Sequence, residues 1–215
     1  MPKIAEEARA ARRDQIIAAA AGCFARAGYH VTTMADIAEA AGVSKGTPYL
    51  YFPSKEALFI ALYEEWDCGL AARVDAAVGA LSESARGSPR NVLAAVASAI
   101  AAHVLDNPQA CRVLMEATTL AAYEPAIAAK VQAVNAASLD QLTGLFAAGV
   151  AAGEWPAGTD PAVQARLFTA GLYGLMAQWH TAAGSFSLET AMTALARQTV
   201  PGSRDAGHNT KGAGP

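Results

Sequence analysis

Apolar residues recur at every third or fourth position along most of this chain, which is the spacing of one helix face. Short stretches that contain glycine or proline separate the apolar runs. Few segments alternate between apolar and polar residues with period two, and few are rich in Val, Ile and Thr as strands are. The pattern therefore predicts an all-α protein.

The N-terminal part predicts one long helix followed by two short ones. Residues 8–28 carry a repeating apolar face, and Thr33 then offers an N-cap, with Asp36 placed as in a capping box. Gly42 ends the first short helix, and a second is predicted over about residues 45–51. Two short helices around a tight turn with glycine form the helix-turn-helix arrangement, although such hairpins also occur in plain helical cores.

The rest of the chain predicts a larger helical domain, divided by prolines and glycines. Helices are expected near residues 55–80, 89–106, 109–122, 125–152, 161–183 and 187–199. The chain thus divides into a helix-turn-helix domain over residues 1–54, a second helical domain over residues 55–201, and a small, polar tail over residues 202–215 that is expected to be disordered.

Charge is distributed unevenly along the chain. Residues 1–55 hold seven Lys and Arg against five Asp and Glu, whereas the remainder holds nine against fourteen. A mildly basic end on an acidic body permits a local surface that faces phosphates. The same distribution also fits surface charge that is placed at random.

Enzymatic, metal and membrane functions find no support in the sequence. The three cysteines, Cys23, Cys68 and Cys111, lie far apart without the spacing of a zinc site or a disulfide framework. No GxSxG, GxGxxG, P-loop or HExxH motif is present, so we expect no catalytic residues, no metal and no cofactor. No apolar run reaches the roughly 18 residues of a membrane span. A cytoplasmic protein with reduced thiols is expected.

The start of the second short helix has the chemistry of a surface that meets DNA. With Ser44 as its predicted N-cap, this helix presents free N–H groups and the positive end of its dipole to phosphate or base acceptors. Gly46 permits close approach, and Thr47 offers a hydroxyl and a methyl group to base edges. Pro48 fixes the backbone and is expected to present a flat apolar face to a base edge.

Aromatic and basic residues follow directly. The hydroxyls of Tyr49 and Tyr51 are expected to reach phosphate oxygens, while Phe52 anchors inward. Lys55 adds a positive charge at the start of the next helix. The alternative, that these aromatics all belong to the core, leaves the nearby polar and basic residues unexplained.

The segment TTMADIAEAAGVSKGTPYLYFPSKEALF, residues 32–59, resembles the N-terminal domain of TetR-family transcriptional regulators. The resemblance implies that the third helix enters the major groove, and that DNA contacts come from Thr33, Lys45, Thr47, Pro48, Tyr49, Tyr51 and Lys55. Pro48 departs from the family pattern, in which a branched apolar residue is commoner. The resemblance also implies an all-α C-terminal domain that dimerises and binds a small effector.

Candidates for these two roles come from the apolar helices. Pockets are mostly apolar with a few polar groups, and the candidates for an effector pocket are Trp66, His103, Met115, Tyr123, Phe146, Tyr173 and Met176. Helix 161–183 is apolar on more than one face, and its candidates for a dimer interface are Phe168, Leu172, Leu175 and Trp179. Each residue also fits the ordinary core of a monomer.

The sequence thus predicts a homodimeric DNA-binding regulator, a repressor that a small, largely apolar ligand releases from a (pseudo)palindromic double-stranded operator. One alternative is a dimer that binds DNA constitutively and has no ligand. Another is an α-helical ligand-binding or adaptor protein that does not bind DNA.

Overall fold

The computed structural model describes residues 2–182 and 185–198, and every regular element within them is helical, as predicted. The predicted disordered tail, residues 202–215, lies outside the described residues. The elements are α1 (Pro2–Ala27), α2 (Met34–Ala40), the 3₁₀ helix η1 (Thr47–Leu50), α3 (Lys55–Gly79), α4 (Glu83–Arg86), α5 (Pro89–Asp106), α6 (Pro108–Leu120), α7 (Pro125–Ala151), α8 (Pro161–Thr181) and α9 (Leu188–Gln198).

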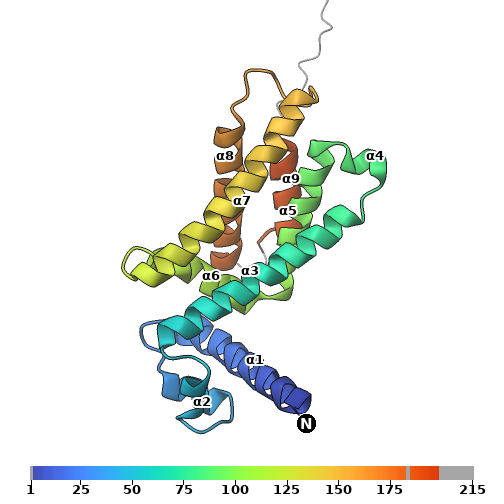
Figure 1. Cartoon of the computed structure of the whole chain (residues 1–215). Coiled ribbons are helices and arrows are strands. Elements are labelled where there is room, and N and C mark those ends of the chain that lie inside the picture. The colour runs from blue at the N-terminus through green and yellow to red at the C-terminus, as the bar shows by residue number, and fades with distance from the viewer. Residues whose placement is uncertain (1, 183–184, 199–215) are drawn as a thin grey trace, which may run out of the picture.

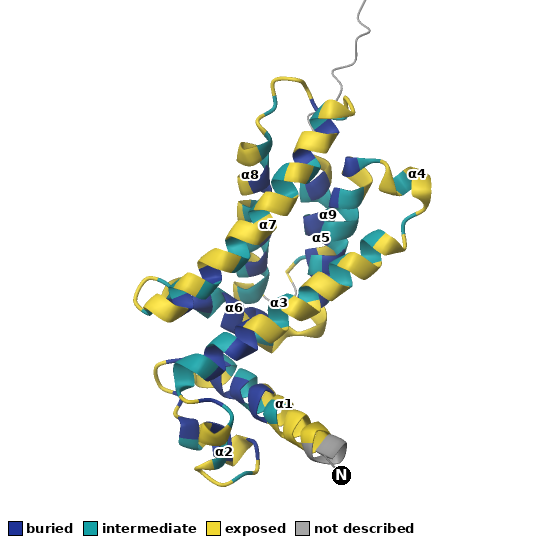
Figure 2. Cartoon of the chain, in the orientation of Figure 1, coloured by how far each residue is buried: buried dark blue, intermediate teal, exposed yellow. Residues whose placement is uncertain are grey.

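The molecule is elongated, with α1, α2 and η1 at one end and a larger body of α5 to α9 at the other (Figure 1). Helix α3 begins among the N-terminal helices and runs diagonally into the body, where it packs on α5. Buried residues continue from α1 across α3 into the body, so both ends share one apolar core (Figure 2). Helix α3 therefore connects the two ends, and α6 of the body also packs directly on α1.

The turn between α1 and η1 follows the predicted local chemistry. The Thr33 hydroxyl accepts from the Asp36 N–H, and the Asp36 carboxylate accepts from the Thr33 N–H, which completes the predicted capping box. Gly42 ends α2 with a φ of +65°, a conformation that side chains disfavour. These two features fix where α2 begins and where the chain turns toward η1.

Proline sets most of the remaining helix starts. Helices α5, α6, α7 and α8 each begin at a proline, whose missing N–H costs nothing in the first turn. Their observed bounds therefore match the predicted ones within two residues. The short α4 was not predicted, because one turn of helix leaves no apolar period to detect.

Candidate DNA-binding surface and ligand cavity

The predicted second short helix is a 3₁₀ turn rather than an α-helix. It covers only Thr47–Leu50 and is preceded by Gly46 as N-cap, without a side-chain capping bond. Ser44 is thus not the N-cap that the sequence predicts, and its hydroxyl lies 2.7 Å from that of Thr47. A 3₁₀ turn accommodates Pro48 at its second position, because the proline N–H is not required there.

Pro48 is an anchor of this turn and does not form part of its outer surface. It is buried, so the prediction that its ring presents a flat face to a base edge is wrong. Its carbonyl accepts from the N–H groups of Tyr51 and Phe52. Phe52 is buried as predicted, and the Arg13 guanidinium lies 5.4 Å from the centre of its ring. The two inward residues hold the exposed ones in place.

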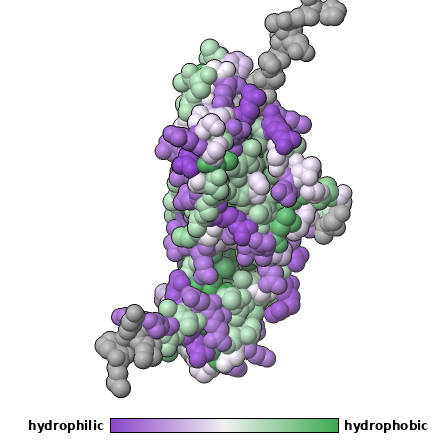
Figure 3. All heavy atoms as spheres, turned by 90° about the vertical axis from the view of Figure 1, so that its right-hand side faces the viewer, coloured by the Kyte–Doolittle hydropathy of each residue, from purple (hydrophilic) through white to green (hydrophobic). Residues whose placement is uncertain are grey.

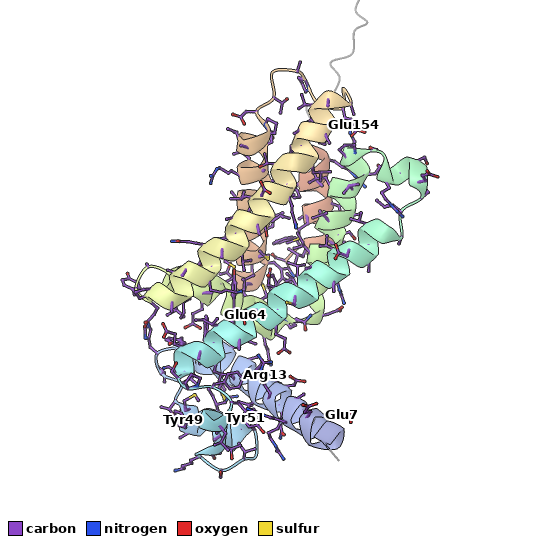
Figure 4. The ribbon with its side chains drawn as sticks, in the orientation of Figure 1. Glu7, Arg13, Tyr49, Tyr51, Glu64 and Glu154 are labelled. Carbon is purple, nitrogen blue, oxygen red and sulfur yellow. The ribbon has the colours of Figure 1, made fainter. Side chains whose placement is uncertain are left out.

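The exposed side of the turn carries polar, basic and apolar groups together. Ser44, Lys45 and Gly46 are exposed, and Tyr49 is 56% exposed. Figure 4 shows Tyr49 and Tyr51 at the end of the molecule that carries α2. Tyr51 is half-buried, with the Arg9 guanidinium 6.0 Å from its ring centre.

Leu50 is 74% exposed and was missed by the sequence reasoning. Its exposure follows from the 3₁₀ geometry of the turn. Side chains three positions apart in a 3₁₀ helix lie on the same side, so Leu50 lies on the side of Thr47. An exposed leucine at this position offers an apolar contact to a thymine methyl group.

The side chain of Lys55 is hydrogen-bonded to backbone carbonyls within the protein. Its ammonium group donates to the carbonyls of Tyr29 at 2.6 Å and Thr32 at 2.9 Å, with that of His30 further away at 3.4 Å. It also lies 4.4 Å from the centre of the Tyr29 ring. The predicted phosphate contact requires these bonds to be given up, so Lys55 is better explained as the clamp between the start of α3 and the turn after α1.

Thr33 is also occupied, because its hydroxyl donates to the Asp36 carboxylate at 2.7 Å. These hydrogen bonds from Thr33 hold the pKa of Asp36 below its usual value. Thr33 is nevertheless exposed, as is Val31 two residues before it. Its N–H and its hydroxyl both donate to the Asp36 carboxylate, so the predicted DNA contact of Thr33 requires one of these bonds to be given up.

Three adjoining cavities lie between α3 and α7. The largest has a volume of about 530 Å³ and is bounded by α3, α5 and α7. A smaller one of about 100 Å³ reaches inward to α8, and an outer one of about 270 Å³ opens between α3 and α7. The first two share Leu70, Ile100 and Leu142, so they form one branched apolar channel.

The structure brings three of the predicted effector residues together. Trp66, Tyr173 and Met176 line the inner cavity. Three others line none of the described cavities: Tyr123 is 77% exposed, Phe146 packs in the core against Trp155 and Phe168, and Met115 packs on the core. We therefore leave these three out of the proposed pocket.

His103 lines a separate cleft of about 600 Å³ between α1, α3 and α6, with Trp66 as a shared wall. Figure 3 shows apolar atoms in a hollow at this waist of the molecule. The ring centres of Trp66 and His103 lie 5.1 Å apart, and burial lowers the pKa of His103. Trp66 Nε1 and His103 Nε2 are both buried, and neither has a hydrogen-bond partner among the residues that the structure describes. Trp66 thus lies between the inner cavity and this cleft.

Polar groups at the inner cavity were missed from sequence. Tyr63, Asp67 and Asn135 all line it, and the Tyr173 hydroxyl donates to Asn135 Oδ1 at 3.2 Å. Burial raises the pKa of Asp67. A single aspartate on a long helix resembles an ordinary surface residue, so its position beside a cavity could not be predicted from the sequence.

The predicted dimer residues divide between two environments. Phe168 and Leu172 are buried within the protomer, whereas Leu175 and Trp179 are half-buried against its core. A different apolar stripe of α8 is exposed at Val163, Leu167 and Ala170 and continues to the half-buried Gly174.

In the described part of the chain, no helix is long and apolar enough to span a membrane, and no group of His, Cys, Asp and Glu side chains is arranged to hold a metal ion.

Two family models match the chain. Residues 16–62 match the model described as "Bacterial regulatory proteins, tetR family", and residues 89–201 match "BetI-type transcriptional repressor, C-terminal". Together they cover both ends of the molecule, including the candidate surface and most of the cavity-forming helices. Both describe regulators and not enzymes.

Individual relatives agree with the two models. The HTH-type transcriptional repressor Rv1474c of Mycobacterium tuberculosis is 45% identical over 65 residues, which are 30% of this chain and 35% of that protein. The HTH-type transcriptional activator FasR of Mycolicibacterium smegmatis is 30% identical over 135 residues, which are 63% of this chain and 58% of that protein. These alignments therefore span less than two thirds of either relative.

Among solved structures, the transcriptional regulator FadR of Bacillus subtilis, in complex with stearoyl-CoA, has a TM-score of 0.76. The match covers 86% of this chain and 96% of FadR, with 24% identity. At this identity the likeness establishes the fold.

Proposed function

The chain belongs to the TetR family of DNA-binding transcriptional regulators, and from this membership we propose that it is a homodimeric repressor that a small, largely apolar ligand releases from a two-fold operator. In this proposal residues 1–54 bind DNA, residues 55–201 bind the ligand and dimerise, and the protein acts in the cytoplasm. The match of residues 89–201 to a repressor-type domain supports repression over activation.

The main observation that supports sequence-specific DNA binding is the composition of the exposed side of η1. Lys45 and Tyr49 project there as a cation and a phenol, and Gly46 leaves open space for a close approach of the sugar-phosphate backbone. Thr47 and Leu50 share one side of the turn and supply a hydroxyl and apolar groups for base edges. Buried Pro48 and Phe52 keep this side rigid.

The exposed stripe on α8 supports dimerisation. Leu167 is 57% exposed and Val163 is 49% exposed on a helix whose opposite face is core. A side chain at Gly174 would meet open space, so a partner helix can approach closely there. A two-fold dimer pairs two reading turns with two half-sites about one helical turn, ~34–36 Å, apart.

The cavity is linked to DNA through α3. Its first residue, Lys55, clamps the turn of residues 29–32, and Trp66 lies about 16 Å further along the helix at the cavity wall. The carboxylate of Glu116 on α6 makes a second link, accepting from the Tyr29 N–H at 2.6 Å. A ligand that moves Trp66 therefore tilts α3 and shifts the helix-turn-helix with it.

This coupling has a bounded size. A ligand changes the DNA-binding equilibrium only by its difference in affinity for the two states. For a coupling of about 1–3 kcal/mol, saturating ligand weakens operator binding roughly 5- to 150-fold, and operator DNA weakens ligand binding equally.

Fluorescence anisotropy with a duplex from upstream of the chain's own gene tests the proposal. At physiological salt, the operator duplex should bind roughly a thousandfold more tightly than a scrambled duplex. Equal affinity for both duplexes at two salt concentrations would refute the proposal of sequence-specific DNA binding. Specific binding that no ligand of the cavity weakens would favour the constitutive dimer.

A further inference from the structure

One carboxylate, that of Asp67, stands at the junction of the three adjoining cavities, and its residue lines all of them. Valines, leucines and Ile100 form most of the wall on the side of the largest cavity. A molecule that fills this channel must therefore place an apolar part along α3 and another part beside Asp67.

The charges of the lining oppose an anionic ligand. Among the described residues that line the three cavities, the charged ones are Asp67, Asp75 and Lys130. The Lys130 ammonium is already bound to the Glu64 carboxylate at 2.9 Å, and Figure 4 shows Glu64 on α3. Among the described lining residues, Lys130 is thus the one cation, and it already has a carboxylate partner, while Asp67 and Asp75 repel a carboxylate or phosphate.

Asp67 itself lacks a partner. It has no hydrogen bond and no ion pair with any other described residue. Burial is the main reason that the pKa of Asp67 is raised, and the positive charge of Lys130 offsets part of that rise. Three aromatic residues, Tyr63, Trp66 and Tyr173, line the inner cavity next to it. Aromatic rings, and a carboxylate without a hydrogen-bonded or ion-paired partner, both favour a cation.

We propose that the ligand of this cavity is a protonated amine that carries an apolar chain, with Asp67 as the partner of its ammonium group. The inference rests on the proposed function only in taking this cavity as the effector site. The ammonium group occupies the junction with the small inner cavity, and the chain follows α3 toward Val78. That path is about 16 Å long, since a helix rises 1.5 Å per residue.

Ligands of equal chain length and different head charge test the proposal on the intact protein. Decylamine, decanol and decanoate are titrated separately, and tryptophan fluorescence reports binding because Trp66 lines the cavity. Decylamine should bind at least tenfold more tightly than decanol, and decanoate should bind most weakly. Stearoyl-CoA, with its several phosphate charges, should bind more weakly than decylamine as well.

Two matched variants assign the preference to one carboxylate. Asp67→Asn should weaken decylamine at least tenfold and leave decanol nearly unchanged. Asp140→Asn removes an exposed carboxylate of α7 that lines no described cavity, and it should leave the preference of the wild type intact. The wild-type series alone decides the sign of the preference if Asp67→Asn does not fold.

Tighter binding of decanoate or stearoyl-CoA than of decylamine would overturn the proposal, as would an unchanged preference in folded Asp67→Asn. Operator binding, measured by anisotropy without ligand, is a separate readout. Its absence would refute the proposed function while leaving the amine preference of the cavity measurable.

Discussion

Lys55 is either a structural clamp or a DNA contact, and its substitution by methionine tests which of the two roles it has. The methionine keeps most of the apolar stem and removes the ammonium group. That group makes two short hydrogen bonds, to the carbonyls of Tyr29 and Thr32, and lies over the Tyr29 ring. Hydrogen bonds to charged groups contribute about 1.5–3 kcal/mol each, and the ring contact about 0.5–1 kcal/mol.

The net loss is smaller than that sum, because the site is half-exposed and water can reach the freed carbonyls. We expect Lys55→Met to lower the free energy of unfolding by about 2 kcal/mol. For a chain of this size, that corresponds to a fall of roughly 4–8 °C in Tm. Circular dichroism at 222 nm during thermal or urea unfolding measures it.

Lys45→Met is the matched control. Lys45 is exposed just before η1, and it has no hydrogen bond or ion pair with any other described residue. Its loss should leave the free energy of unfolding within about 0.5 kcal/mol of the wild type. It should reduce the salt dependence of operator binding by about one phosphate contact. Unchanged stability in Lys55→Met, together with that reduced salt dependence, would refute the clamp and restore Lys55 as a phosphate contact.

Three further changes probe other parts of the molecule. Gly149→Ala should lower stability by about 1–3 kcal/mol or more in urea unfolding, because its Cβ would lie 1.5 Å from the Trp155 ring; an unchanged midpoint would contradict this packing. Leu167→Glu should yield monomers in light scattering, whereas Leu105→Glu, also exposed, should not; a dimer in both would move the interface elsewhere. Thr47→Ala should weaken operator binding by about 1–3 kcal/mol and random DNA less. Ser44→Ala is the control, because it removes the same contact between the Ser44 and Thr47 hydroxyls. If Thr47→Ala weakens binding to operator and random DNA equally, Thr47 does not contact a base.

Local chemistry explains what the sequence predicted well. Prolines fix helix starts within a turn, and the capping box of Thr33 and Asp36 joins residues only three positions apart. The type of helix at Pro48 was harder to predict, because a proline near a helix start is compatible with both an α-helix and a 3₁₀ turn. The choice depends on how Pro48 and Phe52 pack inward, which is a tertiary effect.

Long-range geometry explains what the sequence did not provide. Lys55 resembles a free lysine until the turn of residues 29–32 folds back onto it. Phe146 and Tyr173 both lie on apolar helices, yet one fills the core and the other lines a cavity. Amphipathic periodicity marks the buried face of a helix but does not tell whether protein atoms or a ligand cover it. Asp67 was missed for the converse reason, since a charge that faces a cavity looks like a charge that faces water.

The central claim is that two copies of the η1 surface read two half-sites of an operator. Hydroxyl-radical footprinting of the intact protein on the DNA upstream of its own gene tests this most directly. The account predicts two protected segments related by two-fold symmetry, with centres about one helical turn, ~34–36 Å, apart, and their loss in Thr47→Ala at matched protein concentration. A single protected segment, or uniform protection that Thr47→Ala leaves unchanged, would contradict it.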